Sequence, residues 1–409
     1  MNLTTLIYLA IFFFGIFFLT IFLVLHNRYK KELFSSPQIK KYLSISFLVP
    51  AYNEEETIED TIKSLVNLDY PQNKKEIIII NDGSIDKTLE IAKKLERKYS
   101  IVRVLNKKNS GKANSLNEAI KIAKGELIAV TDADSYPRKD SLKKMVGHFE
   151  EEGVAAVTSR VLVKNKKNYL ERFQILDYSI IAWTRKLLDF VNSVYVTNGP
   201  LSIYKKSVIK KVGGFDPKNL TEDIEVTWHV LSEGYKTRMS YSAVVYTTVP
   251  DKLKTWINQR VRWNLGGIQT VYKYRKFMFK NPDQLFGYFV LPYVAAAFVF
   301  SLIGFMLLIR FFWIKGSYYL ISSLYLFGGY NPFKYIGFIF LPTILIFLAV
   351  IFLTLSIWYY KIGFKNSETG NKSVLKIFAY AMIYRSLYVI PLVLALYKLA
   401  KGDLRWYTK

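Results

Sequence analysis

The sequence predicts an α/β domain with a mostly parallel sheet, joined to a bundle of membrane-spanning helices. Two observations carry this prediction. Short apolar runs alternate with helix-like segments between residues 44 and 130, as they do in a doubly wound sheet. Long uncharged runs flank this region, at residues 1–25 and again beyond residue 284. The chain therefore combines a domain built for water with segments built for lipid.

Four apolar runs are predicted to form the parallel strands. Each is rich in Ile, Val and Leu and stops at a polar turn, as a strand buried on both faces does. These runs are residues 44–50, 76–80, 101–105 and 127–130. The segments between them predict helices over residues 57–67, 86–99 and 119–124, with residues 106–117 leading from the third strand toward the last helix. This alternation is typical of a Rossmann-like domain.

Four apolar runs of a second kind predict membrane spans. A helix needs about 20 apolar residues to cross the hydrocarbon core of a bilayer. The candidates are residues 7–25, 285–309, 335–360 and 377–397. The last contains Arg385, which should face a protein interior or a watery path, or mark the join between an interfacial helix and a shorter span. Residues 316–333 are also uncharged, and the sequence leaves open whether they span the membrane, re-enter it or lie on its surface.

Charge placement predicts the orientation of the chain. The first run lacks the basic start and small-residue cleavage site of a signal peptide, so we expect an anchor. Five Lys and Arg residues follow it between residues 28 and 41, which predicts an outside N-terminus and a cytosolic location for residues 27–284. The net charge of +25 fits a domain held against an anionic leaflet. Nucleic-acid binding is the other interpretation of this charge, and the apolar runs weigh against it. The chain has no cysteine, which excludes disulfides and thiol chemistry.

Two carboxylates directly follow the fourth predicted strand. Asp132 and Asp134 lie beyond the carboxyl end of that strand, where ligands bind in open α/β sheets. Two carboxylates one residue apart can share a hard divalent cation with substrate phosphates. The alternative is an ordinary turn, because Asp is a good turn residue. Two further strands also end in turns rich in Asn, Asp and Glu, and this convergence at one edge favours a binding site.

Three other features carry possible chemistry. Lys112 follows a glycine, which suits close approach to phosphate, although it could be one more solvated lysine. The segment Thr221-Glu222-Asp223 opens a predicted helix over residues 224–234, where a Thr cap and acids in the first turn would suffice as an explanation. Residues 252–280 are amphipathic, basic and aromatic, which is typical of a helix in the membrane interface.

The turns after the strands resemble the donor half of family 2 glycosyltransferases, which fold as a GT-A domain. The resemblance is carried by Pro50-Ala51-Tyr52-Asn53-Glu54, Asn81-Asp82-Gly83-Ser84, Asn109-Ser110-Gly111-Lys112-Ala113 and Asp132-Ala133-Asp134. It implies that the nucleotide sugar is bound by Pro50, Tyr52, Glu54, Asp82, Lys112 and Asp132. It further implies that Asp134, with Asp132 beside it, binds Mg²⁺ or Mn²⁺.

The second half of the domain resembles the acceptor side of the same family. The turn at Gly199 and Pro200 is similar to one that lies below the acceptor sugar in processive members, and its form is closest to hyaluronan and chitin-oligosaccharide synthases. The match to the family's Thr-Glu-Asp implies that Asp223 is the general base of an inverting transfer, a role that Glu222 could exchange with it.

A Q-x-x-R-W signature lies inside the amphipathic segment. It is typical of membrane-bound processive synthases of cellulose, chitin, hyaluronan and poly-N-acetylglucosamine. The resemblance implies that Gln259 and Arg262 hold the diphosphate and that Trp263 stacks on the acceptor sugar. The residues that follow, Asn264-Leu265-Gly266-Gly267, are similar to poly-N-acetylglucosamine synthases, so the two indications of a subfamily disagree.

Together these features predict a multi-pass cell-membrane enzyme with four parts. They are an anchor (1–26), a cytosolic GT-A domain (27–250), interfacial helices with the signature (251–284) and C-terminal spans (285–409). The expected reaction polymerises, and exports, a glycan from a UDP-sugar such as UDP-N-acetylglucosamine or UDP-glucose. One alternative is transfer of a sugar to a polyprenyl phosphate or other lipid. Another is a transporter whose soluble domain only binds nucleotide. Expected partners are the donor, the growing glycan and the bilayer, without nucleic acid, and accessory subunits are left open.

Overall fold

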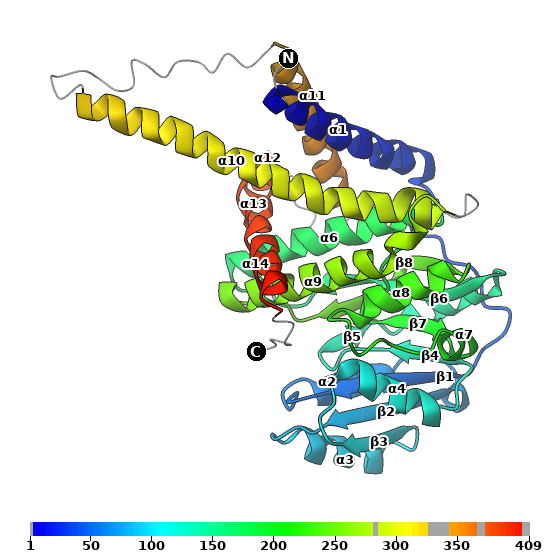
Figure 1. The fold of residues 1–409 in the computed structure, drawn as a ribbon. Coiled ribbons are helices and arrows are strands. Elements are labelled where there is room, and N and C mark those ends of the chain that lie inside the picture. The colour runs from blue at the N-terminus through cyan, green and yellow to red at the C-terminus, as the bar shows by residue number, and fades with distance from the viewer. Residues whose placement is uncertain (1–2, 281–284, 326–342, 366–372, 403–409) are drawn as a thin grey trace.

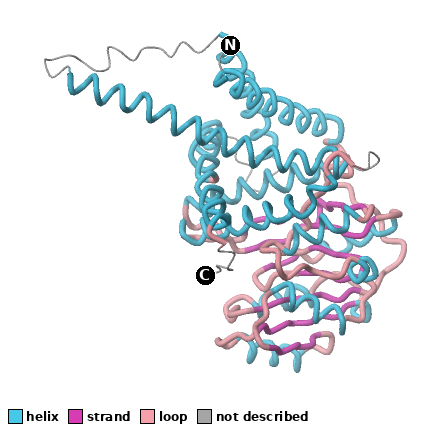
Figure 2. The backbone as a smooth tube through the Cα atoms, in the orientation of Figure 1, coloured by secondary structure: helices cyan, strands magenta, loops and turns pink. Residues whose placement is uncertain are grey.

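The computed structural model describes residues 3–280, 285–325, 343–365 and 373–402. An α/β domain occupies one end of the molecule, and long helices occupy the other (Figure 1). The two parts differ in secondary structure: the described strands lie in the α/β domain, and the opposite end of the molecule is helical (Figure 2). The predicted fold class, a GT-A-type α/β domain with a helical membrane bundle, is confirmed.

One eight-stranded sheet forms the centre of the α/β domain, in the order β3-β2-β1-β4-β7-β6-β8-β5. Its neighbours pair in parallel except at β7, which runs antiparallel to both β4 and β6, and at β5, which runs antiparallel to β8. The strands are β1 (Ile45–Ala51), β2 (Lys75–Asp82), β3 (Val102–Lys107), β4 (Leu127–Val130), β5 (Ser135–Pro137), β6 (Val154–Val163), β7 (Ser202–Lys205) and β8 (Lys236–Thr247).

Helices bury both faces of this sheet, which explains why its strands are apolar without alternation. In β1, Phe47 and Val49 face one core and Leu48 faces the other, and all three are fully buried. One face is covered by α2 (Ile58–Val66), α3 (Thr88–Lys98) and α5 (Ser141–Val146). The other is covered by α4 (Lys112–Ile122), α7 (Lys206–Lys211) and α8 (Glu222–Ser232).

The start of α4 differs from the prediction. Residues 112–122 form a single helix that begins at Lys112, whereas the sequence predicted a helix only from residue 119. Asn114 and Asn117 made this segment look like a loop, because Asn is a weak helix former. Tertiary contacts override that preference, since Asn117 bonds to the backbone of Phe215 through both ends of its amide.

Two helices lie between the sheet and the membrane bundle. The first, α6 (Tyr169–Asp189), opens with a capping box between Asn168 and Glu171 and contacts β6, β8, α1 and α11. The second, α9 (Leu253–Tyr274), contacts α8 on one side and α14 (Val389–Ala400) on the other. Figure 1 shows both helices between the α/β domain and the long helices. They form the layer through which the domain meets the membrane part.

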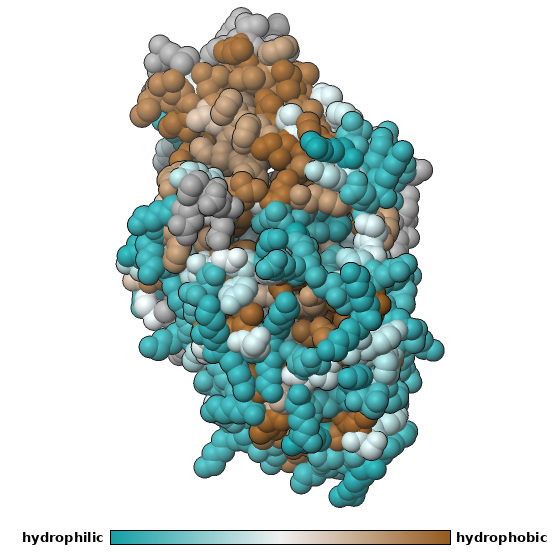
Figure 3. Space-filling view, turned by 90° about the vertical axis from the view of Figure 1, so that its right-hand side faces the viewer, coloured by the Kyte–Doolittle hydropathy of each residue, from teal (hydrophilic) through white to brown (hydrophobic). Residues whose placement is uncertain are grey.

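Four helices in the described part of the chain are long and apolar enough to cross a membrane, so this is a membrane protein. They are Leu3–Tyr29, Phe286–Leu307, Ile344–Lys365 and Leu375–Ala400. Their brown surface stands apart from the mostly teal α/β domain in Figure 3. For the third predicted span, the described residues begin at residue 343, and residues 335–342 lie outside them. Helix α10 (Leu291–Tyr325) includes the first part of the uncharged 316–333 stretch, and residues 326–333 lie outside the described residues.

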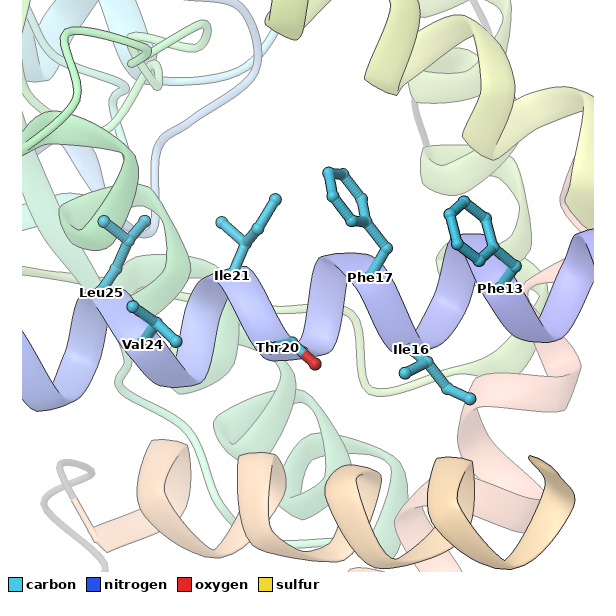
Figure 4. A pocket seen from close by; sticks show the side chains of 7 residues that line it. All are labelled: Phe13, Ile16, Phe17, Thr20, Ile21, Val24 and Leu25. Atoms are coloured by element: carbon cyan, nitrogen blue, oxygen red, sulfur yellow. The ribbon is translucent and has the colours of Figure 1, made fainter. Parts of the chain in front are cut away.

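A shallow groove of about 360 Å³ follows helix α1 (Leu3–Tyr29), and apolar side chains line most of it. Phe13, Phe17, Ile21 and Leu25 project from one side of the helix (Figure 4). Their spacing of four residues places them on one face. Figure 1 shows α1 among the long helices, at the end of the molecule opposite the sheet.

The closest backbone approach in the sheet gives a stability prediction. A Cβ atom on Gly125 would lie 2.5 Å from the backbone nitrogen of Ser46, which cannot move away without disturbing β1. We expect Gly125→Ala to cost about 1–3 kcal/mol of folding free energy and to lower the thermal midpoint of the purified protein. Gly304→Ala is the control, because a Cβ there meets no atom within 4 Å. Equal midpoints for the two variants would contradict this account.

Candidate active site

The polar turns predicted to meet at one sheet edge do so. Ala51 pairs with Asn81 in the parallel register of β1 and β2, and Leu48 pairs with Val130 of β4. The chain then continues from each strand into the turns that carry Tyr52 and Glu54, Asp82, and Asp132 and Asp134. The first two turns are joined, since the Asn53 amide donates to the Ser84 hydroxyl (3.1 Å). Pro50 is the sixth residue of β1, and Tyr52, 47% exposed, lies at the rim.

Asp82 fixes the loop that leads into α4. Its carboxylate accepts hydrogen bonds from the backbone amides of Ser110 and Gly111, each at 2.9 Å, and from the Lys107 ammonium at 3.0 Å. Gly111 has φ +88, a conformation that favours glycine, and it directly precedes the first residue of the helix. Asp82 therefore determines where Lys112 starts α4 and where its side chain can reach.

Lys112 bridges two carboxylates from distant parts of the chain. Its ammonium lies 2.7 Å from Asp132 Oδ1 and 2.8 Å from Glu222 Oε1. Burial alone would lower the pKa of Lys112, but Asp132, Glu222 and Asp223 outweigh it and raise that pKa well above its usual value. Lys112 is therefore a permanent cation that ties the turn after β4 to the first turn of α8.

Asp134 provides a carboxylate suited to a divalent cation. Burial, followed by the charges of Asp132 and Glu54, raises the pKa of Asp134 to about 7. Clustered carboxylates that repel one another are stabilised by a cation, and their oxygens are ligands that Mg²⁺ and Mn²⁺ accept. In the described residues no set of three or more His, Cys, Asp or Glu side chains is arranged to hold a metal. The site thus fits a cation that keeps part of its shell for water or substrate phosphate, as Mg²⁺ commonly does.

The turn before β7 lies against the Asp132 carboxylate. A Cβ atom on Gly199 would be 2.6 Å from Asp132 Oδ2 and 2.9 Å from Oδ1. Any side chain larger than that of glycine would therefore displace the Asp132 carboxylate. The neighbouring Asn198 accepts a hydrogen bond from the Thr158 hydroxyl (2.8 Å), which ties the turn to β6. Pro200 follows in the same turn. The Gly-Pro turn and the two carboxylates after β4 therefore share one wall of the site.

The two acids at the start of α8 have opposite properties. Burial would raise the pKa of Glu222, but the Lys112 ammonium outweighs it and lowers that pKa. Asp223 has no ion pair of its own among the described residues, and burial together with the Glu222 charge raises its pKa to about 6. One acid is thus held as an anion by its partner. The other can take up and release a proton near neutral pH, which is what a general base requires.

Helix α9 closes the site from the membrane side. A Cβ atom on Gly266 would be 2.1 Å from the Thr221 hydroxyl oxygen, so α8 and α9 touch through a glycine. Arg262 donates to the Leu220 carbonyl (3.2 Å), which places it beside the acids of α8. Gln259 and Trp263 are tied to Arg260 instead, by a 2.7 Å hydrogen bond and by a guanidinium–ring distance of 3.9 Å.

Sequence reasoning missed the contribution of α6. Arg185 of this helix donates to the Asn198 side chain directly beneath the Gly-Pro turn. Asp177 of the same helix is fully buried against α9 and the C-terminal helices. The one available signal was the capping pattern Asn168-x-x-Glu171 before an apolar repeat, which predicts a helix but no role in a site.

The unequal acids give a prediction that does not depend on activity. The Asp223 side chain should change from carboxylate to carboxylic acid as the pH falls through about 6, because its pKa lies above that of an ordinary Asp. Infrared difference spectra of the purified protein between pH 5 and pH 7.5 should show this change. Asp223→Asn should remove the component that titrates near pH 6 and leave the Asp134 component near pH 7, whereas Glu222→Gln should keep the Asp223 component and move it to lower pH. An unchanged band in Asp223→Asn would contradict the assignment.

Three comparisons found known proteins with a similar sequence or fold. Residues 46–213 match the family described as "Glycosyl transferase family 2". The chain is 35% identical over 248 residues to a poly-beta-1,6-N-acetyl-D-glucosamine synthase of Staphylococcus epidermidis. The aligned region covers 60% of this chain and 60% of that protein. It is 37% identical over 225 residues to the synthase of Staphylococcus aureus strain COL, covering 54% of each.

The fold is also shared with a solved structure. A mannosyltransferase from Pyrobaculum calidifontis, in complex with GDP-Man and Mn²⁺, superposes with a TM-score of 0.60 at 19% identity over 98% of this chain and 100% of that one. The chain thus spans 60% or less of the length of the curated synthases quoted above, while its architecture matches a glycosyltransferase throughout. Residues 46–213 are thus similar to the glycosyl transferase family 2 model, the fold is of the GT-A type, and the sequence is similar to poly-beta-1,6-N-acetyl-D-glucosamine synthases.

Proposed function

We propose that this protein is an inverting glycosyltransferase of the membrane that extends a glycan from a nucleoside-diphosphate sugar. The observation that carries the proposal is the Lys112 bridge between Asp132 and Glu222. It joins the turns expected to hold the donor to the helix expected to hold the base. Asp223, with its raised pKa, directly follows Glu222 and has no ion pair among the described residues, so it is the acid we assign as the base.

The chain's own residues supply the steps of such a transfer. Asp223 takes the proton of an acceptor hydroxyl while that oxygen bonds to the anomeric carbon and the bond to the diphosphate breaks, which inverts the centre. Lys112 and Arg262 offer positive charge to the departing diphosphate, the place where negative charge develops. Asp134 and Asp132 would hold Mg²⁺ or Mn²⁺, whose charge when bound neutralises the same group.

Donor identity and topology belong to the same proposal. The relatives named above are poly-beta-1,6-N-acetyl-D-glucosamine synthases, which favours UDP-N-acetylglucosamine as donor and a growing glycan as acceptor. The basic residues after the first span favour an outside N-terminus and a cytosolic GT-A domain. The proposed division is an anchor (1–26), the GT-A domain (27–250), the connecting helices (251–284) and the C-terminal spans (285–409).

Turnover by the purified protein in lipid nanodiscs tests the function. The donors are UDP-N-acetylglucosamine, UDP-glucose and GDP-mannose, each with Mg²⁺ or Mn²⁺, and both nucleotide release and product size are measured. We expect turnover with UDP-N-acetylglucosamine and a high-mass product. Asp223→Asn should lower kcat by about 10²–10⁴-fold, because a general base is lost, with little change in donor binding.

Matched variants make this test specific. Asp60→Asn replaces an exposed carboxylate on α2, outside the site, and should keep full activity. Glu222→Gln removes one anion from Lys112 and should weaken donor binding more than it lowers kcat. A product that is small or lipid-extractable would favour transfer to a lipid carrier. Absence of turnover with all three donors, or full activity of Asp223→Asn, would overturn the proposal.

The Gly-Pro turn offers an independent prediction. Gly199→Ala would push a methyl group into the Asp132 carboxylate and displace it from Lys112. We expect kcat/KM for the donor to fall on the order of 10²-fold, the usual result of a misplaced binding group. The thermal midpoint should stay close to wild type, since the turn lies at the site and not in the core. Unchanged kinetics would show that the turn does not position Asp132.

A further inference from the structure

A buried charged cluster lies outside the carboxylate site, where α6, α9 and the C-terminal span meet. Asp177 of α6 is its centre and is fully buried, and Arg260 of α9 is 1% exposed. The remaining members come from one face of the last span. Three tyrosines are spaced four residues apart, Tyr380, Tyr384 and Tyr388, and Arg385 directly follows the second of them. The reaction derived above uses none of these residues.

The three tyrosine hydroxyls converge on one carboxylate. Asp177 Oδ1 accepts a hydrogen bond from Tyr380 (2.8 Å), and Oδ2 accepts from Tyr388 and more distantly from Tyr384 (3.4 Å). Arg385 places a guanidinium nitrogen 3.6 Å from Oδ1, although 45% of its side chain is exposed. The intramembrane arginine expected to need a protein partner therefore has one on α6.

The same hydroxyls also bind α9. Tyr388 accepts a hydrogen bond from Arg260 Nε (3.0 Å), and Tyr384 accepts one from the Trp256 indole (3.0 Å). Arg260 Nη2 lies 3.5 Å from Asp177 itself. Burial would lower the pKa of Arg260, but the surrounding tyrosines and Asp177 outweigh it, so its charge persists in the interior. A buried charge of this kind is held only by such partners, and their directions restrict its position.

Arg260 then passes this restraint to the signature residues. Its Nη1 donates to the Gln259 side chain at 2.7 Å, and its guanidinium lies 3.9 Å from the centre of the Trp263 ring. A second, independent feature marks the other end of the chain of contacts. Residues Tyr380–Tyr384 form a single turn of π-helix, an irregularity found frequently at functional sites, and Tyr380 and Tyr384 of this turn reach Asp177.

We propose that Asp177 is a positioning residue that ties the acceptor platform at Trp263 to the C-terminal membrane span. Through Arg260 and the three tyrosines it makes the place of Gln259 and Trp263 depend on where that span lies. The proposal rests on the proposed function, since Trp263 is the surface expected to hold the acceptor sugar. It predicts an effect on retention of the growing glycan rather than on the chemical step.

Product length is the readout that separates positioning from folding. In nanodiscs with UDP-N-acetylglucosamine, Asp177→Asn should shorten the mean product about fivefold, because one set of charge-assisted hydrogen bonds is lost. The KM for the donor should stay near wild type. A variant that is merely less stable would make less polymer of unchanged length, since the surviving molecules are intact. Tyr388→Phe should shift the lengths in the same direction by a smaller factor.

The same helix supplies a matched control. Asp189 of α6 is also a buried carboxylate with its own cation, Lys186 at 2.6 Å, but it bonds to β8 rather than to α9. Asp189→Asn should reduce stability without shortening the product. Asp177→Glu, which keeps the charge, should recover part of the wild-type length. Equal product lengths in wild type and Asp177→Asn would overturn the proposal, and so would equal shortening by Asp189→Asn.

A donor-independent measurement distinguishes failure of this proposal from failure of the proposed function. The chain has no cysteine, so a single cysteine at Asn264, beside Trp263, reports only its own surroundings. Its rate of labelling by a maleimide should rise in Asp177→Asn and not in Asp189→Asn. If wild type makes no polymer but the labelling differs in this way, the positioning role stands and the polymerase assignment fails. Identical labelling in the two variants would overturn the positioning role.

Discussion

Much of the site depends on one ammonium group. Lys112 is held between Asp132 and Glu222, which come from a strand turn and a helix start 90 residues apart in the chain. Without a cation there, at least three carboxylates would crowd a partly desolvated space, and repulsion would force some of them to be protonated or to move. The same bridge lowers the pKa of Glu222, and the Glu222 charge then helps to raise that of Asp223. The contact between Lys112 and Glu222 thus helps to give two neighbouring acids pKa values that are shifted in opposite directions.

The backbone around the bridge is arranged to serve it. Asp82 holds the loop that starts α4 and so aims Lys112. Gly199 leaves room for Asp132, and Gly266 lets α9 approach Thr221 at the head of α8. None of these residues needs to touch substrate to matter, because each fixes where a charged group can lie. Residues that hold a charged group in place in this way commonly decide whether a site is ordered well enough to work.

Local patterns predicted the fold and the meeting of the polar turns at one sheet edge, but not the contacts between distant segments. The apolar runs of β1, β2 and β4 and the acids behind them are signals that repeat within a few residues, so the sheet edge could be predicted. The start of α4 was placed too late because Asn117 is stabilised by Phe215, which is distant in sequence. Asp177 and Tyr380, 203 residues apart, share no local pattern, and nothing in either segment alone predicts that they meet.

The packing of Gly266 against Thr221 has a practical consequence for anyone who wishes to study the α/β domain alone. Helix α9 is a wall of the site as well as a link to the membrane, and it is itself held by α14 and the C-terminal tyrosines. A fragment that stops at the last strand would expose the head of α8 and lose Arg262 from the Leu220 carbonyl. Such a fragment would lack one wall of the candidate site, so its behaviour in solution would describe the turns at the sheet edge and not the complete site.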